Sequence, residues 1–150
     1  MSPLDARVLA ERAAAVERHL ARVAARLPAQ PSELLTATDA SDAVILHLWQ
    51  ATQIVIDLAV AACVAEGLGT PKSYADAFTR LGRAGVIPAD LADRLVRAAG
   101  FRNVVAHAYE HLDMSRVYLA ATTGPADLLA FLGSAARLVR EAEDDAPPSR

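Results

Sequence analysis

Apolar residues recur at alternating steps of four and three positions in several separate stretches of this chain. The first stretch contains Leu9, Ala13, Val16, Leu20, Val23 and Leu27. Because an α-helix has 3.6 residues per turn, this spacing collects the apolar side chains on one side of a helix. We therefore expect a first helix that packs on other helices through this stripe and ends near Pro28 and Pro31.

The segment from about Ser41 to Glu66 is the most apolar, and Val44 to Val64 approaches the length of a membrane span. Polar residues interrupt it at steps of three, three and four: His47, Gln50, Gln53 and Asp57. A carboxylate near the centre of a bilayer costs on the order of 3 kcal/mol, so we expect a central bundle helix and no membrane span. The polar stripe either faces water, lines an interface or holds Asp57 near a cation such as Arg102.

Glycine, proline and capping residues mark the boundaries of the next helices. The apolar segment ends before Gly67, Gly69 and Pro71. Ser73 with Asp76 is typical of an N-terminal cap, so we expect a shorter helix from there to about Gly85. Pro88 suits the first turn of a fourth helix that continues through residues 102 to 109.

The C-terminal part contains another glycine and proline signal. We expect a short helical piece to begin at Asp113 or Ser115 and to be broken at Gly124-Pro125. A last helix then carries the apolar stripe Leu128, Leu132, Ala135 and Val139. The stretch Glu141–Arg150 is acidic and then contains prolines, and we expect it to fray.

Length and composition favour one all-helical domain. At 150 residues the chain can bury a substantial core without metal or disulfide staples. Hydrophobic residues make up 53% but aromatic residues only 5%, because alanine, leucine and valine dominate, and these favour helix at helical spacing. We predict an all-α, up-and-down bundle of about five helices in residues 1–145, followed by a flexible tail, 146–150.

The cysteine content and the start of the chain indicate a cytoplasmic protein. The single cysteine, Cys63, lies in an apolar run, and we expect it to be a small core residue. The start, Met1–Asp5, lacks a basic region followed by an apolar one, so we expect no secretory signal.

The net charge of −3 and the pI near 5.8 provide no broad attraction for nucleic acid. Any contact with RNA therefore requires a local basic site. One candidate is an arginine ridge on the first helix, formed at steps of four residues by Arg18, Arg22 and Arg26. This ridge either meets phosphates, meets an acidic partner or is solvated.

The fourth helix has an arginine in its apolar stripe, which consists of Leu91, Leu95, Ala98, Arg102, Val105 and Tyr109. A guanidinium cannot lose its charge, so Arg102 needs a carboxylate, a water-filled crevice or an anionic ligand. One interpretation is a salt bridge to Asp57 or another acid. The other is a phosphate-binding site.

His107 lies five residues after Arg102, which places it about 140° round the helix and about 7.5 Å further along. The two side chains therefore share no face. They converge on one phosphate only if the arginine wraps round, if the helix loosens near Gly100 or His107, or if a second subunit supplies the other half. A homodimer meets this requirement directly, because a two-fold axis brings equivalent residues together.

Together Arg102 and His107 have the chemistry to cleave RNA without a metal. Histidine exchanges protons near neutral pH, and arginine binds the charge that develops on a phosphorane. Asn103 either positions a phosphate or His107, or caps the helix end. Tyr109 either stacks on a base or donates a hydrogen bond, or it is a partly buried aromatic. We expect His111 at the surface, and no metal or cofactor, because glycine loops for phosphate and metal-binding motifs are not found.

The segment Arg102–Tyr109, an arginine, four residues, a histidine, one residue and a tyrosine, resembles the signature of the HEPN ribonucleases. The form with tyrosine resembles that of the HepT-like toxins. The likeness extends over Leu48–Gln50, Ile56–Ala59, Pro71–Tyr74, Leu81–Ile87 and Gly100–Asp113, which is most of the chain. It implies a HEPN-like dimer with the cleft at the subunit interface, where Arg102 and His107 are catalytic and Asn103 and Tyr109 support them.

The resemblance further implies the toxin of a type II toxin–antitoxin system, an endoribonuclease in which the 2′-hydroxyl of a tRNA or mRNA attacks the adjacent phosphate. It implies as partner an MNT-type nucleotidyltransferase antitoxin that transfers AMP to Tyr109 and so places negative charge beside Arg102. The alternative is a non-catalytic helical dimer that docks a nucleotidyltransferase or binds a nucleotide.

Overall fold

The computed structural model describes residues 4–34 and 39–149. These residues form five long helices, a one-turn helix and a 3-10 turn: α1 (Ala6–Arg26), α2 (Pro31–Leu34), α3 (Asp39–Ala65), α4 (Tyr74–Arg83), α5 (Ala89–Ala108), η1 (Tyr109–His111) and α6 (Met114–Asp144). No strand occurs in the two described ranges. The predicted all-α bundle of about five helices is confirmed.

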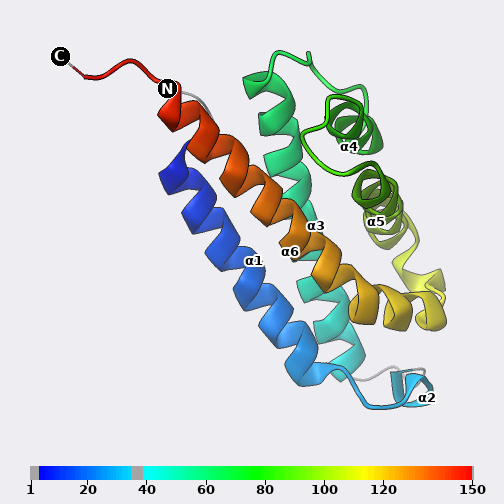
Figure 1. Ribbon diagram of the computed structural model, residues 1–150. Coiled ribbons are helices and arrows are strands. Elements are labelled where there is room, and N and C mark those ends of the chain that lie inside the picture. Colours follow the sequence, from blue (N-terminus) through cyan, green and yellow to red (C-terminus); the bar gives the residue numbers. More distant parts are fainter. Residues whose placement is uncertain (1–3, 35–38, 150) are drawn as a thin grey trace.

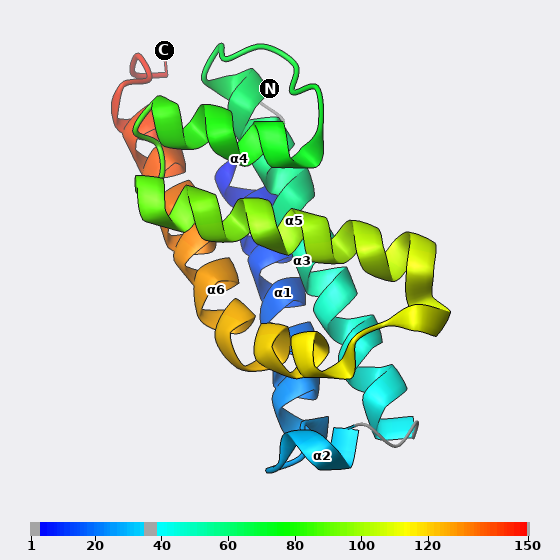
Figure 2. The same cartoon turned by 90° about the vertical axis from the view of Figure 1, so that its right-hand side faces the viewer.

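Helix α3 is the central element, because it contacts α1, α4, α5 and α6. Helices α1, α3 and α6 run alongside one another, whereas α4 and α5 form a hairpin that crosses them and is seen almost end-on in Figure 1. Figure 2 shows the C-terminal end of α5 projecting beyond α3. This end carries the segment that the sequence singles out.

The apolar helix α3 packs as a core helix. By length and composition it is able to span a membrane, but 50% of its most apolar window is buried inside the bundle. Its fully buried side chains, such as Val55, Ile56 and Ala59, face the larger of two hydrophobic clusters, and Val44 and Leu48 face the smaller one. The expectation of a central bundle helix is therefore confirmed.

The prediction of a break at Gly124-Pro125 is wrong. Helix α6 runs without interruption from Met114 to Asp144 with Pro125 inside it. Proline removes one backbone hydrogen bond and favours a bend, and α6 changes direction between its gold and orange parts in Figure 2. Burial of Val117 in one hydrophobic cluster and of Leu128 in the other holds both halves in place, so packing overrides the local signal.

The two ends of the chain were also predicted from sequence. Helix α6 continues past Glu141 to Asp144, so the first part of the stretch expected to fray is helical. Two further predictions are a flexible tail at residues 146–150 and a start, Met1–Asp5, without a secretory signal. Each of these predictions includes residues that the structure does not describe. Arg150 and residues 1–3 lie outside the described residues.

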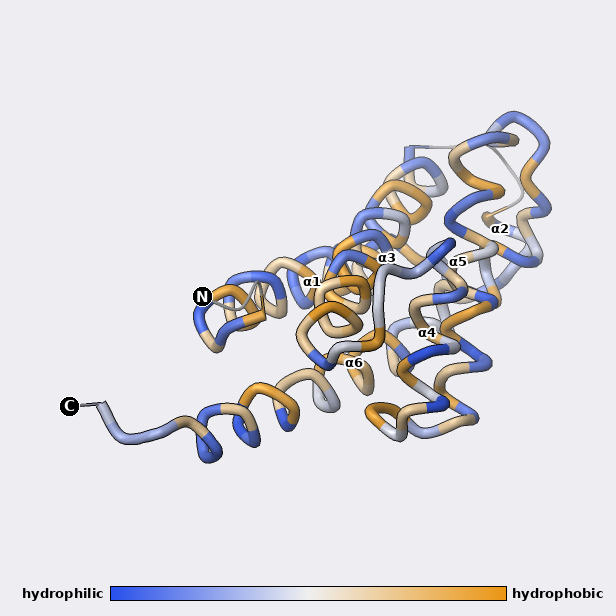
Figure 3. The backbone as a smooth tube through the Cα atoms, turned by 90° about the horizontal axis from the view of Figure 1, so that it is seen from above, coloured by the Kyte–Doolittle hydropathy of each residue, from blue (hydrophilic) through white to orange (hydrophobic). Residues whose placement is uncertain are grey.

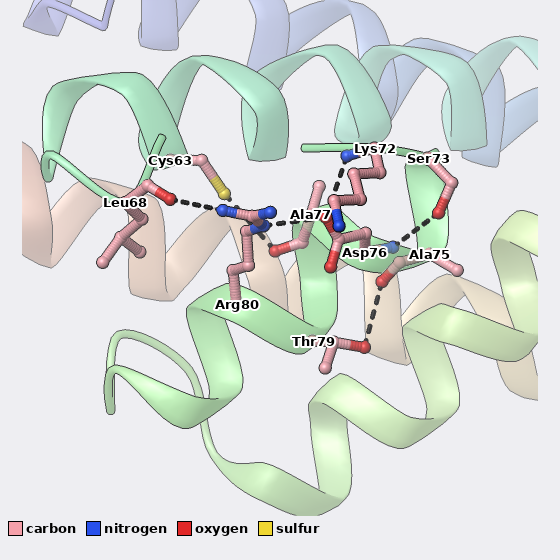
Figure 4. A network of polar contacts seen from close by, with 9 residues as sticks. All are labelled: Cys63, Leu68, Lys72, Ser73, Ala75, Asp76, Ala77, Thr79 and Arg80. Carbon is pink, nitrogen blue, oxygen red and sulfur yellow. Dashed lines mark hydrogen bonds and ion pairs between the residues drawn. The ribbon is translucent and has the colours of Figure 1, made fainter. Parts of the chain in front are cut away.

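Helix α4 is tied to the end of α3 by the polar network in Figure 4. Ser73 caps the helix by accepting the backbone N–H of Asp76 at 3.0 Å, which confirms the predicted cap. Asp76 accepts the backbone N–H of Lys72 at 2.8 Å and Arg80 Nε at 2.7 Å, and these bonds lower the pKa of its carboxyl. Arg80 Nη1 donates to the Leu68 carbonyl at 2.7 Å, so both ends of the α3–α4 connection are held.

Close packing also places α4 against α3 and α5. Cys63 on α3 is buried, as predicted, and its thiol lies 3.4 Å from the Ala77 carbonyl on α4. A Cβ added at Gly82 would lie 2.7 Å from the Cβ of Ala92 on α5. Glycine is therefore required in the last turn of α4, where this turn lies against the first turn of α5.

We expect Gly82→Ala to lower the free energy of unfolding by about 1 to 3 kcal/mol, because the new methyl group forces α4 and α5 apart. Gly133→Ala is the matched control, since its Cβ would meet no atom within 4 Å and alanine favours helix by about 0.5 to 1 kcal/mol. Urea unfolding followed by circular dichroism measures both. Equal stabilisation by the two substitutions would contradict the tight contact.

Candidate active site between α3, α4 and α5

The candidate site lies on the C-terminal half of α5, which departs from helical backbone angles only at its last residue, Ala108 (φ −139°, ψ 37°). The helix does not loosen at Gly100, and His107 occupies its last turn. Arg102 is half-buried, whereas Asn103 and His107 are exposed. The expectation that Arg102 and His107 lie on different sides of their helix is confirmed.

Arg102 is held by aromatic rings and an amide. Its guanidinium carbon lies 5.4 Å from the centre of the Trp49 ring on α3 and 5.2 Å from that of Tyr74 on α4. Both distances fall in the range of cation–π contacts, which favour arginine in such positions. Arg102 Nε donates to Gln53 Oε1 at 2.6 Å. Three helices therefore converge on this side chain.

Asp57 does not pair directly with Arg102. Gln53 stands between them, because its Nε2 donates to Asp57 Oδ1 at 2.9 Å while its carbonyl oxygen accepts from Arg102. Within residues 4–34 and 39–149 no carboxylate forms an ion pair with Arg102. Of the two interpretations of Arg102, the salt bridge to Asp57 is thus wrong, and the positive charge is stabilised without being neutralised by a described carboxylate.

Gln53 binds Nε of the guanidinium, which leaves Nη1 and Nη2. Arg102 Nη1 lies 3.3 Å from Asn103 Oδ1, and Nη2 donates to none of the described residues. Asn103 thus contacts the arginine, and its place five residues before the end of α5 excludes a role in capping that end. Nη2, on a guanidinium whose orientation is fixed by its other contacts, is suited to donate to an anionic ligand.

Tyr109 joins the C-terminal end of α5 to the start of α3. Its hydroxyl donates to Asp42 Oδ1 at 2.7 Å, and 46% of the residue is exposed. Partial burial, and then the hydrogen bond to Asp42, raise the pKa of the Tyr109 phenol. The phenol is therefore protonated at neutral pH. The Asp42 carboxylate, which accepts its hydrogen bond, is placed to take the proton when the oxygen reacts.

The polar stripe on α3 serves both neighbouring helices and does not simply face water. His47 contacts His19 on α1, with 3.0 Å between their Nδ1 atoms, and Gln53 contacts Arg102 on α5. Asp57 is exposed. Among the expected site residues, the structure brings Arg102 and Asn103 into contact, and it leaves His107 and Tyr109 further along α5 and η1.

Sequence analysis missed Trp49, Tyr74 and Asp42. Trp49 and Tyr74 lie in the segments that resemble the HEPN ribonucleases, Leu48–Gln50 and Pro71–Tyr74, and this resemblance is the signal that could have identified them. Asp42 has no comparable signal, because its contact joins positions 67 residues apart. His111 is exposed, as expected, and the described ranges contain no group of three or more His, Cys, Asp or Glu that would hold a metal ion.

Comparison with known proteins gives consistent results. A family model described as "Ribonuclease HepT-like" matches residues 16–135. The mRNA nuclease HepT of Shewanella oneidensis is 36% identical over 76 residues, a match that spans 51% of this chain and 57% of that protein. The matched part of the chain thus spans little more than half of this curated relative.

Solved structures are similar over a larger part of the chain. One is the tri-AMPylated Shewanella oneidensis HEPN toxin in complex with MNT antitoxin, at 26% identity and a TM-score of 0.75, covering 84% of this chain and 94% of that one. Another is a toxin–antitoxin complex with AMP-PNP, at 25% identity and a TM-score of 0.77, covering 84% and 95%.

We expect Gln53→Leu to lower the free energy of unfolding by about 1 kcal/mol, because Arg102 Nε loses its acceptor. In an Arg102→Met background the same substitution should cost less than half as much. Denaturant unfolding of the two single variants and the double variant measures the coupling. An identical cost in both backgrounds would show that the hydrogen bond does not hold Arg102.

Proposed function

Because the chain belongs to the HepT-like family of ribonucleases, we propose that it is a metal-independent endoribonuclease and the toxin of a type II toxin–antitoxin system in the cytoplasm. The observation that carries this proposal is the guanidinium of Arg102, which lies in cation–π contact with Trp49 and Tyr74 and is not neutralised by any carboxylate of the described residues. Such a group binds a phosphodiester and the additional negative charge that forms on it during cleavage.

In the proposed reaction the 2′-hydroxyl oxygen of an RNA, such as tRNA or mRNA, attacks the adjacent phosphorus. His107 takes the proton of that hydroxyl as general base, and Arg102 binds the phosphate oxygens. The bond from phosphorus to the 5′-oxygen breaks, which leaves a 2′,3′-cyclic phosphate and, after protonation by an acid, a free 5′-hydroxyl. Asn103 keeps Arg102 orientated through its contact with Nη1.

The proposed active form is a homodimer with facing motifs. Arg102 faces α3 and α4, whereas His107 is on the exposed side of α5, so one subunit does not bring them together. Val104, 49% exposed, and the exposed Gly100 lie on this outward side with His107 and provide a surface for a second copy. A two-fold axis there brings the outward faces of the two α5 helices together, with the His107 side chains of both subunits in one cleft.

The proposed partner is an MNT-type nucleotidyltransferase antitoxin that AMPylates Tyr109. The Tyr109 oxygen attacks the α-phosphorus of ATP, pyrophosphate leaves, and Asp42, 2.7 Å away, receives the phenolic proton. The related toxin in complex with MNT antitoxin is described as tri-AMPylated, which supports this assignment. The phosphate added at Tyr109 competes with RNA for the cleft and silences the toxin.

A second candidate function is a non-catalytic dimer that docks the nucleotidyltransferase or binds a nucleotide. The observation in its favour is Tyr109 with its acceptor Asp42, which suits a modification site whether or not RNA is cleaved. Cleavage of RNA by the purified protein in EDTA decides between the two functions, because the second predicts binding alone.

We expect His107→Ala to slow the cleavage of tRNA or mRNA by about 10² to 10⁴-fold while the fold and the dimer persist, because the proton-transfer group is lost. His111→Ala, an exposed histidine on η1, is the matched control and should cleave normally. Gel assays in EDTA measure both rates. Cleavage that survives in His107→Ala, or that stops when EDTA is added, would refute the mechanism.

We expect Tyr109→Phe to abolish AMP transfer from ATP by the partner nucleotidyltransferase, and Asp42→Asn to slow it by roughly tenfold or more, because the proton acceptor is lost. Tyr118→Phe is the control, since the Tyr118 hydroxyl donates to the carbonyls of Pro28 and Ala29. Intact-mass spectrometry counts the AMP groups. Unchanged AMPylation of Tyr109→Phe would place the modification elsewhere.

A further inference from the structure

The arginine ridge on α1 lies away from Arg102, on the other side of α3. Arg18, Arg22 and Arg26 are all exposed, and within the described ranges none of them forms an ion pair. On a helix a step of four residues advances about 6 Å, which is close to the length of one nucleotide in an extended strand. A protein with a net charge of −3 thus carries a row of uncompensated positive charges at nucleotide spacing.

Two histidines extend this ridge toward α3. His19 on α1 and His47 on α3 are half-buried, their Nδ1 atoms are 3.0 Å apart and their rings are tilted by 30°. Burial lowers the pKa of both imidazoles, and the charge of Arg22 lowers both further. Both histidines are therefore neutral at neutral pH, and a bound anion would favour their protonation.

A hollow beside His47 is lined by side chains that suit a phosphate group. It is lined by Arg22, Ala25, Arg26, Ala43 and His47. The two alanines leave space between α1 and α3, and the two guanidiniums and the imidazole supply hydrogen-bond donors around it. Donors of this kind, arranged about a small opening, are suited to phosphate oxygens.

The polar stripe of α3 connects this hollow to the candidate active site. His47 and Gln53 lie on that stripe with Gln50 between them, six residues and about 9 Å apart along the axis. Gln53 binds Arg102 directly. Figure 3 shows α1 and α5 on opposite sides of α3, so an extended ligand that leaves the arginine ridge crosses α3 to reach Arg102.

We infer that the arginine ridge and the His19–His47 pair bind the phosphates of single-stranded RNA and lead the strand across α3 to Arg102, an inference that rests on the function proposed above. Phosphate contacts of this kind position an RNA without reading its bases. In this arrangement α1 binds the RNA and sets the direction in which the strand runs, whereas α5 carries the residues that cleave it.

The test compares Arg22→Gln/Arg26→Gln with Arg137→Gln/Arg140→Gln, each in the His107→Ala protein so that the RNA stays intact. Arg137 and Arg140 are exposed and lie near the C-terminal end of α6, beside the N-terminal end of α1 and far from the ridge (Figure 1). Both double variants change the net charge equally. Fluorescence anisotropy with a labelled single-stranded RNA, repeated from low to high salt, measures affinity.

We expect the ridge variant to bind the RNA roughly tenfold more weakly at low salt than the His107→Ala protein does. Its slope of log affinity against log salt should be smaller in magnitude by about 1.4, as for two lost phosphate contacts. The control variant should keep both values. In NMR spectra, addition of the RNA should raise the pKa of His19 and His47. Circular dichroism checks that both variants fold.

Equal affinities and salt slopes in the two variants would overturn the inference, as would loss of antitoxin binding by the ridge variant with unchanged RNA binding. In the latter case the ridge docks an acidic protein surface. RNA cleavage by the unsubstituted protein is measured separately. Its absence would refute the proposed function, while the salt slopes still decide whether the ridge binds RNA.

Discussion

A permanent positive charge in the apolar stripe of α5 is the constraint on which the candidate site depends. Arg102 cannot shed its proton, and burial without a partner would be costly. A carboxylate would have met this need but would have cancelled the charge. The rings of Trp49 and Tyr74 and the amide of Gln53 instead stabilise the cation and leave its charge uncompensated. The same contacts that make the arginine tolerable in the fold therefore keep it able to attract a phosphate.

The rest of the fold serves to bring three helices to this side chain. The network around Asp76 and Arg80 orientates the start of α4, and the absence of a side chain at Gly82 lets α4 lie against α5. Tyr74 reaches Arg102 as a result. The polar residues of α3 connect its neighbours on both sides, with His47 toward α1 and Gln53 toward α5.

The distribution of charge matters more for this chain than its total. The overall charge is negative, yet the cations with no carboxylate partner among the described residues include Arg102 on α5 and the arginine ridge on α1. A negative ligand is drawn to such local sites even when the whole protein repels it, because the ionic atmosphere screens charges more than about 8 Å away. Tyr109, tied to Asp42, lies in η1, directly after the helix that carries Arg102.

Sequence alone determined the features that depend on neighbouring residues in the chain. The end of α1 before Pro28, the cap at Ser73, the buried Cys63 and the divergence of Arg102 and His107 all follow from local backbone chemistry or helical periodicity. Only the tertiary structure decided that α6 passes through Pro125, that Gln53 and not Asp57 binds Arg102, and that Asp42 meets Tyr109. These outcomes depend on how helices cross and in what register, which many buried contacts set together and no local pattern encodes.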